Sequence, residues 1–195
     1  MNRVPVILLG VALVFALAAA GLMWRAMDQS GGEMAGAAPI GGPFRLIDQD
    51  GRIRSDRDFR GHWVLLYFGY TSCPDVCPAT LQNIADALPR LKAKARNIVP
   101  VFVTLDPDRD HPQTLKRYLA SFGPQFVGLT GTLPQITAIA HAYRVYFAKH
   151  PLPGGDYSVD HASTIYLLSP AGTFVTVFDT QEGAAALAKD IAARI

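Results

Sequence analysis

The two cysteines of this 195-residue chain, Cys73 and Cys77, are separated by three residues. A continuous apolar run, residues 63–68, precedes them and predicts a strand that is buried on both faces. Apolar residues at helical spacing follow them from Leu81 onward. We therefore expect both thiols at a junction where a strand ends and a helix begins near Pro78.

This junction has consequences for thiol chemistry. The first turn of a helix presents unpaired N–H groups and the positive end of the helix dipole. Both stabilise a thiolate, so we expect the pKa of both cysteines to lie below the ~8.5 of a free thiol. Thiols at positions i and i+4 are within reach of a shared metal ion or of a disulfide bond. The alternative is a pair of inert, buried cysteines. It fits the sequence poorly, because a proline follows each cysteine, Pro74 and Pro78, at the junction of the strand and the helix.

A site with two thiolates needs a further ligand to hold a metal ion, and five histidines are available. His161 is the best candidate, because it follows a breaker-rich loop and precedes a predicted strand that begins at Ile165. Asp160 or another nearby carboxylate could orient its ring through a hydrogen bond. Spacing alone does not assign this role, since a single loop histidine is more often an ordinary surface residue. The remaining histidines are interpreted as structural or exposed: His62, His111, His141 and His150.

The elements that must position these residues alternate along the chain. The order predicts an α/β sheet that is mainly parallel and covered on both faces. In such sheets, sites gather beyond the carboxyl ends of the strands, where the Cys73 loop and the loop at Asp106 both fall. The expected elements are a hairpin at 44–53, strands at 63–69, 98–105 and 126–129, helices at 78–94, 111–122 and 132–143, a hairpin at 165–178 and a helix at 182–195. Ser55 could cap a short helix through Phe59, and Pro89 should kink the helix at 78–94 or end it early.

The N-terminal segment predicts a membrane anchor. Residues 4–24 are uncharged and mostly apolar, and they are long enough to cross ~30 Å of hydrocarbon. Arg3 precedes them, and a basic N-terminus favours a cytoplasmic N-terminus with an exported domain. A signal peptide cleaved near residues 18–20 is the alternative, although the apolar run exceeds a usual signal core. The predicted organisation is a short N-terminus at 1–3, a transmembrane signal anchor at 4–24, a flexible linker at 25–43 and one domain at 44–195.

The overall composition excludes several classes of protein. Half of the residues are hydrophobic, which is ample for a packed core. The net charge is +2 and the charges are scattered, so nothing indicates a nucleic-acid-binding surface. Two cysteines are too few for a disulfide scaffold, which favours a reactive or metal-binding pair.

Three segments, at 67–78, 103–110 and 157–164, resemble in order the sequence blocks of the Sco/SenC family of membrane-anchored copper proteins. The similarity extends from about Phe44 to the C-terminus. It implies a thioredoxin-like fold with the N-terminal β-hairpin as an extension, and copper ligands at Cys73, Cys77 and His161. The implied role is assembly of the binuclear copper centre in subunit II of cytochrome c oxidase. Residues 162–163 depart slightly from the family pattern, which leaves the ligands untouched.

The first functional hypothesis is therefore a copper chaperone rather than an enzyme. Cu(I) is soft and favours thiolate and imidazole ligands, with Cu(II) as the alternative state, whereas structural zinc normally takes four protein ligands. The second hypothesis is a thiol–disulfide oxidoreductase, with Cys73 and Cys77 as its redox-active pair, that reduces the oxidase's copper-ligand cysteines or acts in redox signalling. The spacing differs from C-x-x-C, which favours the metal. A peroxidase-like thiol enzyme is a third, more distant alternative.

Location and partners follow from these interpretations. We expect a single-pass protein of the inner membrane, with its domain in the periplasm or, in a mitochondrion, in the intermembrane space. The expected partners are subunit II of cytochrome c oxidase, other periplasmic copper chaperones or thiol–disulfide oxidoreductases, and the membrane, but no nucleic acid. The roles of Asp106 and Arg109 stay open between tuning the thiols, facing the partner and forming a structural turn.

Overall fold

The computed structural model describes residues 17–24 and 39–195. The chain divides into two units, Met1–Pro39 and Ile40–Ile195, which are described separately. In the first unit, residues 17–24 are helical, while most of the predicted anchor and linker lies outside the described residues. Within the described ranges, no helix is both long enough and apolar enough to cross a membrane.

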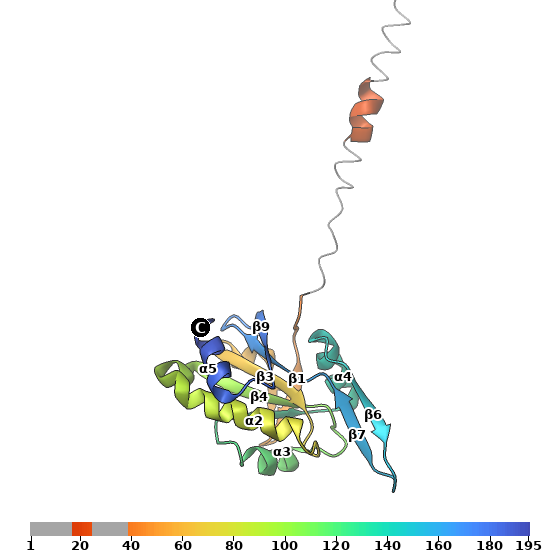
Figure 1. The fold of residues 1–195 in the computed structure, drawn as a ribbon. Coiled ribbons are helices and arrows are strands. Elements are labelled where there is room, and N and C mark those ends of the chain that lie inside the picture. Colours follow the sequence, from red (N-terminus) through yellow and green to blue (C-terminus); the bar gives the residue numbers. More distant parts are fainter. Residues whose placement is uncertain (1–16, 25–38) are drawn as a thin grey trace, which may run out of the picture. The chain divides into compact units, whose positions relative to one another are not determined.

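The second unit is built on a seven-stranded sheet with the order β2-β1-β5-β4-β3-β8-β9 (Figure 1). The three central strands are parallel, and the strands toward both edges pair antiparallel. The prediction of a mainly parallel sheet is therefore wrong outside its centre, because the terminal hairpins join the same sheet. The strands are β1 (Arg45–Asp48), β2 (Ile53–Ser55), β3 (Trp63–Gly69), β4 (Ile98–Thr104), β5 (Val127–Thr130), β8 (Thr164–Leu168) and β9 (Phe174–Asp179).

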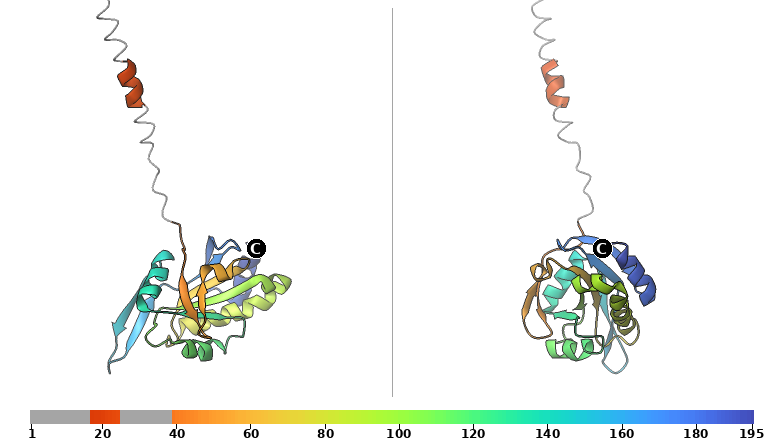
Figure 2. Two further views of the ribbon diagram at one scale, coloured as in Figure 1. Left: turned by 180° about the vertical axis from the view of Figure 1, so that it is seen from behind. Right: turned by 90° about the vertical axis from the view of Figure 1, so that its left-hand side faces the viewer.

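Helices cover both faces of this sheet, as predicted. Successive side chains of a strand point to opposite faces. In β3, Tyr67 packs against Phe102 on the face of α2 and α3, whereas Phe68 packs against Tyr143 at the end of α4. The views in Figures 1 and 2 place α5 beside α2 and α4 behind the sheet. The helices are α2 (Val76–Ala87), α3 (Pro112–Leu119), α4 (Leu133–Ala142) and α5 (Ala184–Ala192).

The boundaries of α2 place the two cysteines differently from each other. The helix begins at Val76 rather than at Pro78, so Cys77 lies in its first turn and Cys73 lies in the loop before it. Pro89 ends the α-helix, as expected, and the chain continues as a 3-10 segment, η2 (Leu88–Asn97). Another short 3-10 helix, η1 (Asp56–Phe59), follows β2 and has the predicted N-cap at Ser55.

Two strands were not anticipated from the sequence. Strands β6 (Phe147–Pro151) and β7 (Tyr157–His161) pair antiparallel and form a two-stranded sheet of their own. The breaker-rich segment 152–156 is their turn, and the hairpin extends away from the main sheet near α4 (Figure 1). His161 therefore ends a strand and lies opposite Phe147, instead of standing in a loop.

Candidate metal centre

The structure brings Cys73, Cys77 and His161 together beyond the carboxyl end of β3. The backbone N–H of Cys77 donates to Sγ of Cys73 at 3.4 Å, and Sγ of Cys77 lies 3.5 Å from Nε2 of His161. Nδ1 of His161 lies 3.1 Å from the carbonyl oxygen of Ala162. Because a carbonyl oxygen only accepts, Nδ1 carries the proton in that hydrogen bond. Nε2 is therefore the ring nitrogen that faces the sulfur of Cys77.

The partner of the histidine ring differs from the one expected. Asp160 was predicted to orient His161, but its carboxylate lies 3.1 Å from Nε2 of His150 on the neighbouring strand. Asp160 and His161 are adjacent in a strand, so their side chains point to opposite faces. The main-chain carbonyl of Ala162 takes the orienting role instead.

Aromatic side chains surround the buried thiol. Cys77 is fully buried, whereas Cys73 is partly exposed. The hydroxyl of Tyr67 donates to Sγ of Cys77 at 3.6 Å. The ring of His161 packs edge-on against Tyr70 and Tyr67, with centroids 6.0 Å and 6.4 Å away. One sulfur of the pair is therefore shielded by the protein and the other is accessible from solvent.

The two thiols differ in acidity. A hydrogen bond from Cys77 lowers the pKa of Cys73 well below that of a free thiol, and contacts from His161 and the backbone N–H of Cys77 act in the same direction. The same interaction with Cys73, together with burial, raises the pKa of Cys77. The expectation of two acidic cysteines is thus right for Cys73 and wrong for Cys77, because one proton is shared by the pair and stays on the buried sulfur.

This difference predicts selective alkylation. We expect iodoacetamide to modify Cys73 rather than Cys77, at a rate that changes little between about pH 8 and about pH 5. A thiol with an unperturbed pKa of ~8.5 would instead react about tenfold more slowly for each pH unit below that value. Peptide mass spectrometry of the reduced, metal-free protein identifies the modified sulfur. Cys77→Ala removes the hydrogen-bond donor and should restore a steeper pH dependence; equal labelling of both cysteines would contradict the assignment.

The cysteine loop is held by a carboxylate that sequence reasoning did not single out. Asp110, from the loop between β4 and α3, accepts hydrogen bonds from the backbone N–H of Thr71 at 2.9 Å and from the hydroxyls of Thr71 and Thr104. Burial raises the pKa of Asp110, although these hydrogen bonds oppose the shift. The segment 103–110 thus holds the segment 67–78, which carries the cysteines, through Asp110 and Thr71. The sequence signal for this contact was that both segments resemble family blocks in the same order.

The remaining histidines lie away from this cluster in the fold. His111 is the N-cap of α3, His141 lies in α4 and His150 lies in β6. Among the described residues, no three Cys, His, Asp or Glu side chains are already spaced to hold a metal ion.

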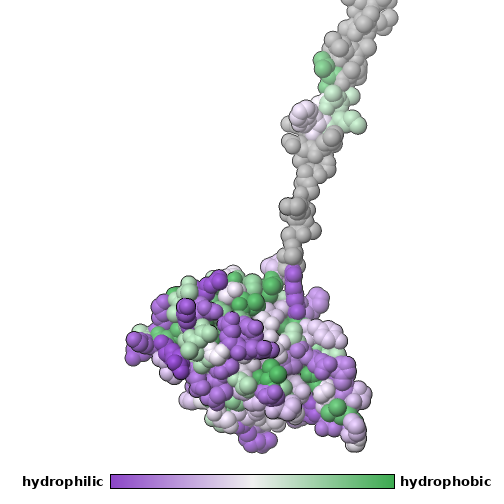
Figure 3. Space-filling model, in the orientation of Figure 1, coloured by the Kyte–Doolittle hydropathy of each residue, from purple (hydrophilic) through white to green (hydrophobic). Residues whose placement is uncertain are grey.

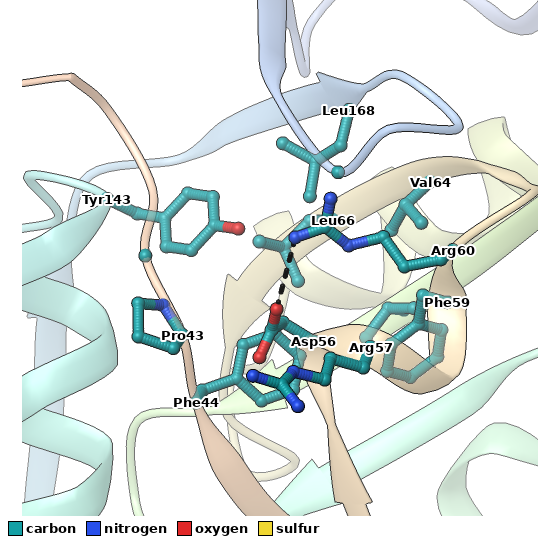
Figure 4. A pocket seen from close by; sticks show the side chains of 13 residues that line it. Pro43, Phe44, Asp56, Arg57, Phe59, Arg60, Val64, Leu66, Tyr143 and Leu168 are labelled. Atoms are coloured by element: carbon teal, nitrogen blue, oxygen red, sulfur yellow. Dashed lines mark hydrogen bonds and ion pairs between the residues drawn. The ribbon is translucent and has the colours of Figure 1, made fainter.

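A cavity of about 320 Å³ lies on the other side of the sheet. Figure 4 shows Phe44, Phe59 and Tyr143 around it, together with the Arg60–Asp56 ion pair, 3.3 Å long, in its lining. None of the residues that line this cavity is a cysteine or a histidine. The cysteines and histidines of the described residues therefore lie outside the lining of this cavity.

The chain is similar to a known protein family over most of its length. The family model described as SCO1/SenC matches residues 32–195. The mitochondrial SCO2 homologue of Bos taurus is 41% identical over 186 residues, covering 88% of this chain and 70% of that protein. The mitochondrial SCO1 homologue 1 of Arabidopsis thaliana is 43% identical over 148 residues, covering 75% of this chain and 44% of that protein. The chain thus matches less than half of that relative's length.

Solved structures show the same fold. The crystal structure of Arabidopsis thaliana ScoI with copper bound superposes with a TM-score of 0.76 at 38% identity, covering 80% of this chain and 97% of that chain. The unit from Ile40 to Ile195, with its sheet, helices and hairpins, therefore has the thioredoxin-like architecture of these proteins.

Proposed function

The chain belongs to the SCO1/SenC family, and we propose that it binds copper through Cys73, Cys77 and His161 and assists the assembly of cytochrome c oxidase. The observation that carries the proposal is the convergence of two sulfurs and one imidazole nitrogen from distant parts of the chain. Sγ of Cys77 lies 3.5 Å from Nε2 of His161, and the backbone N–H of Cys77 donates to Sγ of Cys73 at 3.4 Å. We further propose subunit II as the recipient of the copper and the membrane as the site of action.

The donor set suits Cu(I). Thiolate sulfur and imidazole nitrogen are the ligands that a soft, monovalent copper ion prefers. Cys73 would supply a thiolate without losing a proton, because its pKa is lowered, and Nε2 of His161, which faces Cys77, would supply the imidazole nitrogen. Cys77 must release its proton on binding, so copper affinity should rise with pH. Three protein ligands leave room for a ligand from the recipient.

Exposed side chains flank the ligand-bearing segments. Val76, next to Cys77, is 44% exposed, and Tyr146, whose carbonyl accepts from the N–H of Ala162, is 68% exposed. Elsewhere the face that carries α2 and α5 is largely hydrophilic with small hydrophobic spots (Figure 3). Exposed side chains next to the segments that carry Cys77 and His161 are suited to transient docking of a partner that receives the metal.

Replacement of the histidine tests the copper site. We expect the reduced full-length chain to bind one Cu(I) tightly, and His161→Ala to weaken this binding by about tenfold or more. A competition titration with a chromophoric Cu(I) chelator measures the affinity. His150→Ala, in the same hairpin but paired with Asp160, is the matched control and should leave affinity unchanged. Unchanged affinity in His161→Ala would remove the histidine from the site.

A second function, thiol–disulfide exchange, is favoured by one observation, the contrast between an accessible, acidic Cys73 and a buried Cys77. The Cys73 thiolate would attack a partner disulfide and release one thiolate. Cys77, after losing its proton, would then attack Sγ of Cys73 and release the second, leaving an intramolecular disulfide. If His161→Ala loses copper in vitro but still supports oxidase assembly in cells, this second function is the correct one.

A further inference from the structure

We propose that Asp106 and Arg109 are positioning residues that clamp the β6–β7 hairpin, and with it His161, against the cysteine loop. The inference rests on the proposed function, because it takes His161 as a ligand. It assigns a role to two residues of the segment 103–110 whose function the sequence alone did not decide.

The hairpin needs such a clamp because the main sheet does not hold it. Strands β6 and β7 pair only with each other in the described sheets. Within β7, Val159 is the single buried residue and therefore the main apolar anchor. The placement of His161, two residues further along, thus depends on side-chain contacts with the rest of the domain.

A buried carboxylate of the main domain receives side chains from both strands of the hairpin. Asp106 follows β4 and is fully buried. It accepts a 2.8 Å hydrogen bond from the hydroxyl of Tyr157 in β7, and Nζ of Lys149 in β6 lies 3.6 Å away. Its other oxygen pairs with Nε of Arg109. One carboxylate therefore connects both strands of the hairpin to the carboxyl end of the main sheet.

Arg109 connects the hairpin to the cysteine loop. Its Nη1 donates to the backbone carbonyl of Tyr157 at 3.1 Å and to Asp156 at 2.9 Å. Its guanidinium stacks on the ring of Tyr157 at 3.9 Å and lies 5.9 Å from the ring of Tyr70, which itself packs against His161. Nη2 is buried without a hydrogen-bond partner, so the guanidinium is held by the bonds of Nη1, by stacking and by the ion pair with Asp106.

The geometry has a direct consequence for the histidine. A ligand group holds a metal tightly when surrounding contacts fix its rotamer and backbone before the metal arrives. Removing one member of the buried pair leaves Asp106 with only Lys149, or Arg109 with only Asp156, as its ion-pair partner, which favours rearrangement of the segment that carries it. Loss of the clamp should therefore weaken copper binding by releasing His161 from the cysteines, with the ligands themselves intact.

A double-mutant cycle tests this route. We expect Asp106→Asn and Arg109→Gln each to weaken Cu(I) binding by about 10- to 100-fold in the otherwise native full-length chain. The same substitutions in a His161→Ala background should change affinity by less than about twofold, because they act through the histidine. Asp108→Asn is the matched control, since it removes only the exposed 2.7 Å ion pair with Lys149 and should leave affinity unchanged.

A metal-free readout separates positioning from general stability. Amide hydrogen exchange of the apo protein should become faster in Tyr157–His161 of both clamp variants, while the amides of β3 keep their protection. If a clamp variant loses protection in β3 as well, Tyr157→Phe, which removes one hydroxyl contact to Asp106, takes its place in both measurements.

Two results would overturn the proposal: unchanged exchange in β7, or an equal loss of copper affinity with and without His161. A normal affinity in His161→Ala alone would contradict the proposed function instead, while faster exchange in β7 would still report the clamp. The failures of the two proposals are thus distinguishable.

Discussion

We expect copper affinity to fall by more than about 100-fold when serine replaces Cys77, a larger loss than for removal of the imidazole. Sγ of Cys77 lies at the centre of the site, where it contacts Nε2 of His161 and receives the hydroxyl of Tyr67. A serine oxygen nearly preserves the packing, but it is a hard ligand that keeps its proton. The cause of the loss is therefore the ligand and not the fold.

The chelator competition used for the histidine variant measures this effect, and thermal unfolding monitors the fold. Val76→Ala is the matched control, because Val76 lies in the same turn of α2 but is 44% exposed. Its affinity should stay within about twofold of the native value. Near-native binding by Cys77→Ser would show that the buried sulfur is not a ligand.

We expect stability and copper binding both to decrease when alanine replaces Gly69 at the end of β3. A Cβ at this position would lie 2.7 Å from Sγ of Cys77, 3.0 Å from Phe102 and 3.3 Å from Tyr67. The sulfur and both rings are fully buried, so none of them can move away freely. We expect overpacking to cost ~1–3 kcal/mol in the free energy of unfolding and to displace the thiol from His161.

Denaturant unfolding and the Cu(I) titration measure the two effects of Gly69→Ala. Gly42→Ala is a suitable control, because a Cβ there meets the side chain of Ala142 at an ordinary 3.6 Å. Its free energy of unfolding should change by less than about 0.5 kcal/mol. If Gly69→Ala kept both properties, the close packing of the thiol against the strand would be refuted.

The parts of the fold that local pattern determines were predictable. Strand β3 runs from Trp63 to Gly69 as expected, because an unbroken apolar run fits a strand buried on both faces. Pro89 ends α2, because proline removes a helical hydrogen bond. These two elements fix the loop between them, so the position of the cysteines at a sheet edge followed from the sequence.

The features that depend on distant partners were not predictable from pattern. Strand β6 contains lysine, histidine and proline at exposed positions, so no alternation marks it. Asp106 and Asp110 follow a strand and read as ordinary polar loop residues, yet both are fully buried by partners elsewhere in the chain. The helix dipole argument considered each thiol alone, whereas the two cysteines share one proton and cannot both be acidic.

Cys77 and His161 are 84 residues apart in sequence although their side chains touch. A copper ion bound by both would close a long chain loop, as a reversible cross-link does. In the unfolded chain the same closure would cost conformational entropy, so the ion would bind the folded state more tightly. Binding to the folded state alone adds about 2.7 kcal/mol of stability when free copper is 100 times the dissociation constant. Donation of the metal would therefore leave a less stable chain, so empty and loaded protein would differ in their resistance to proteolysis.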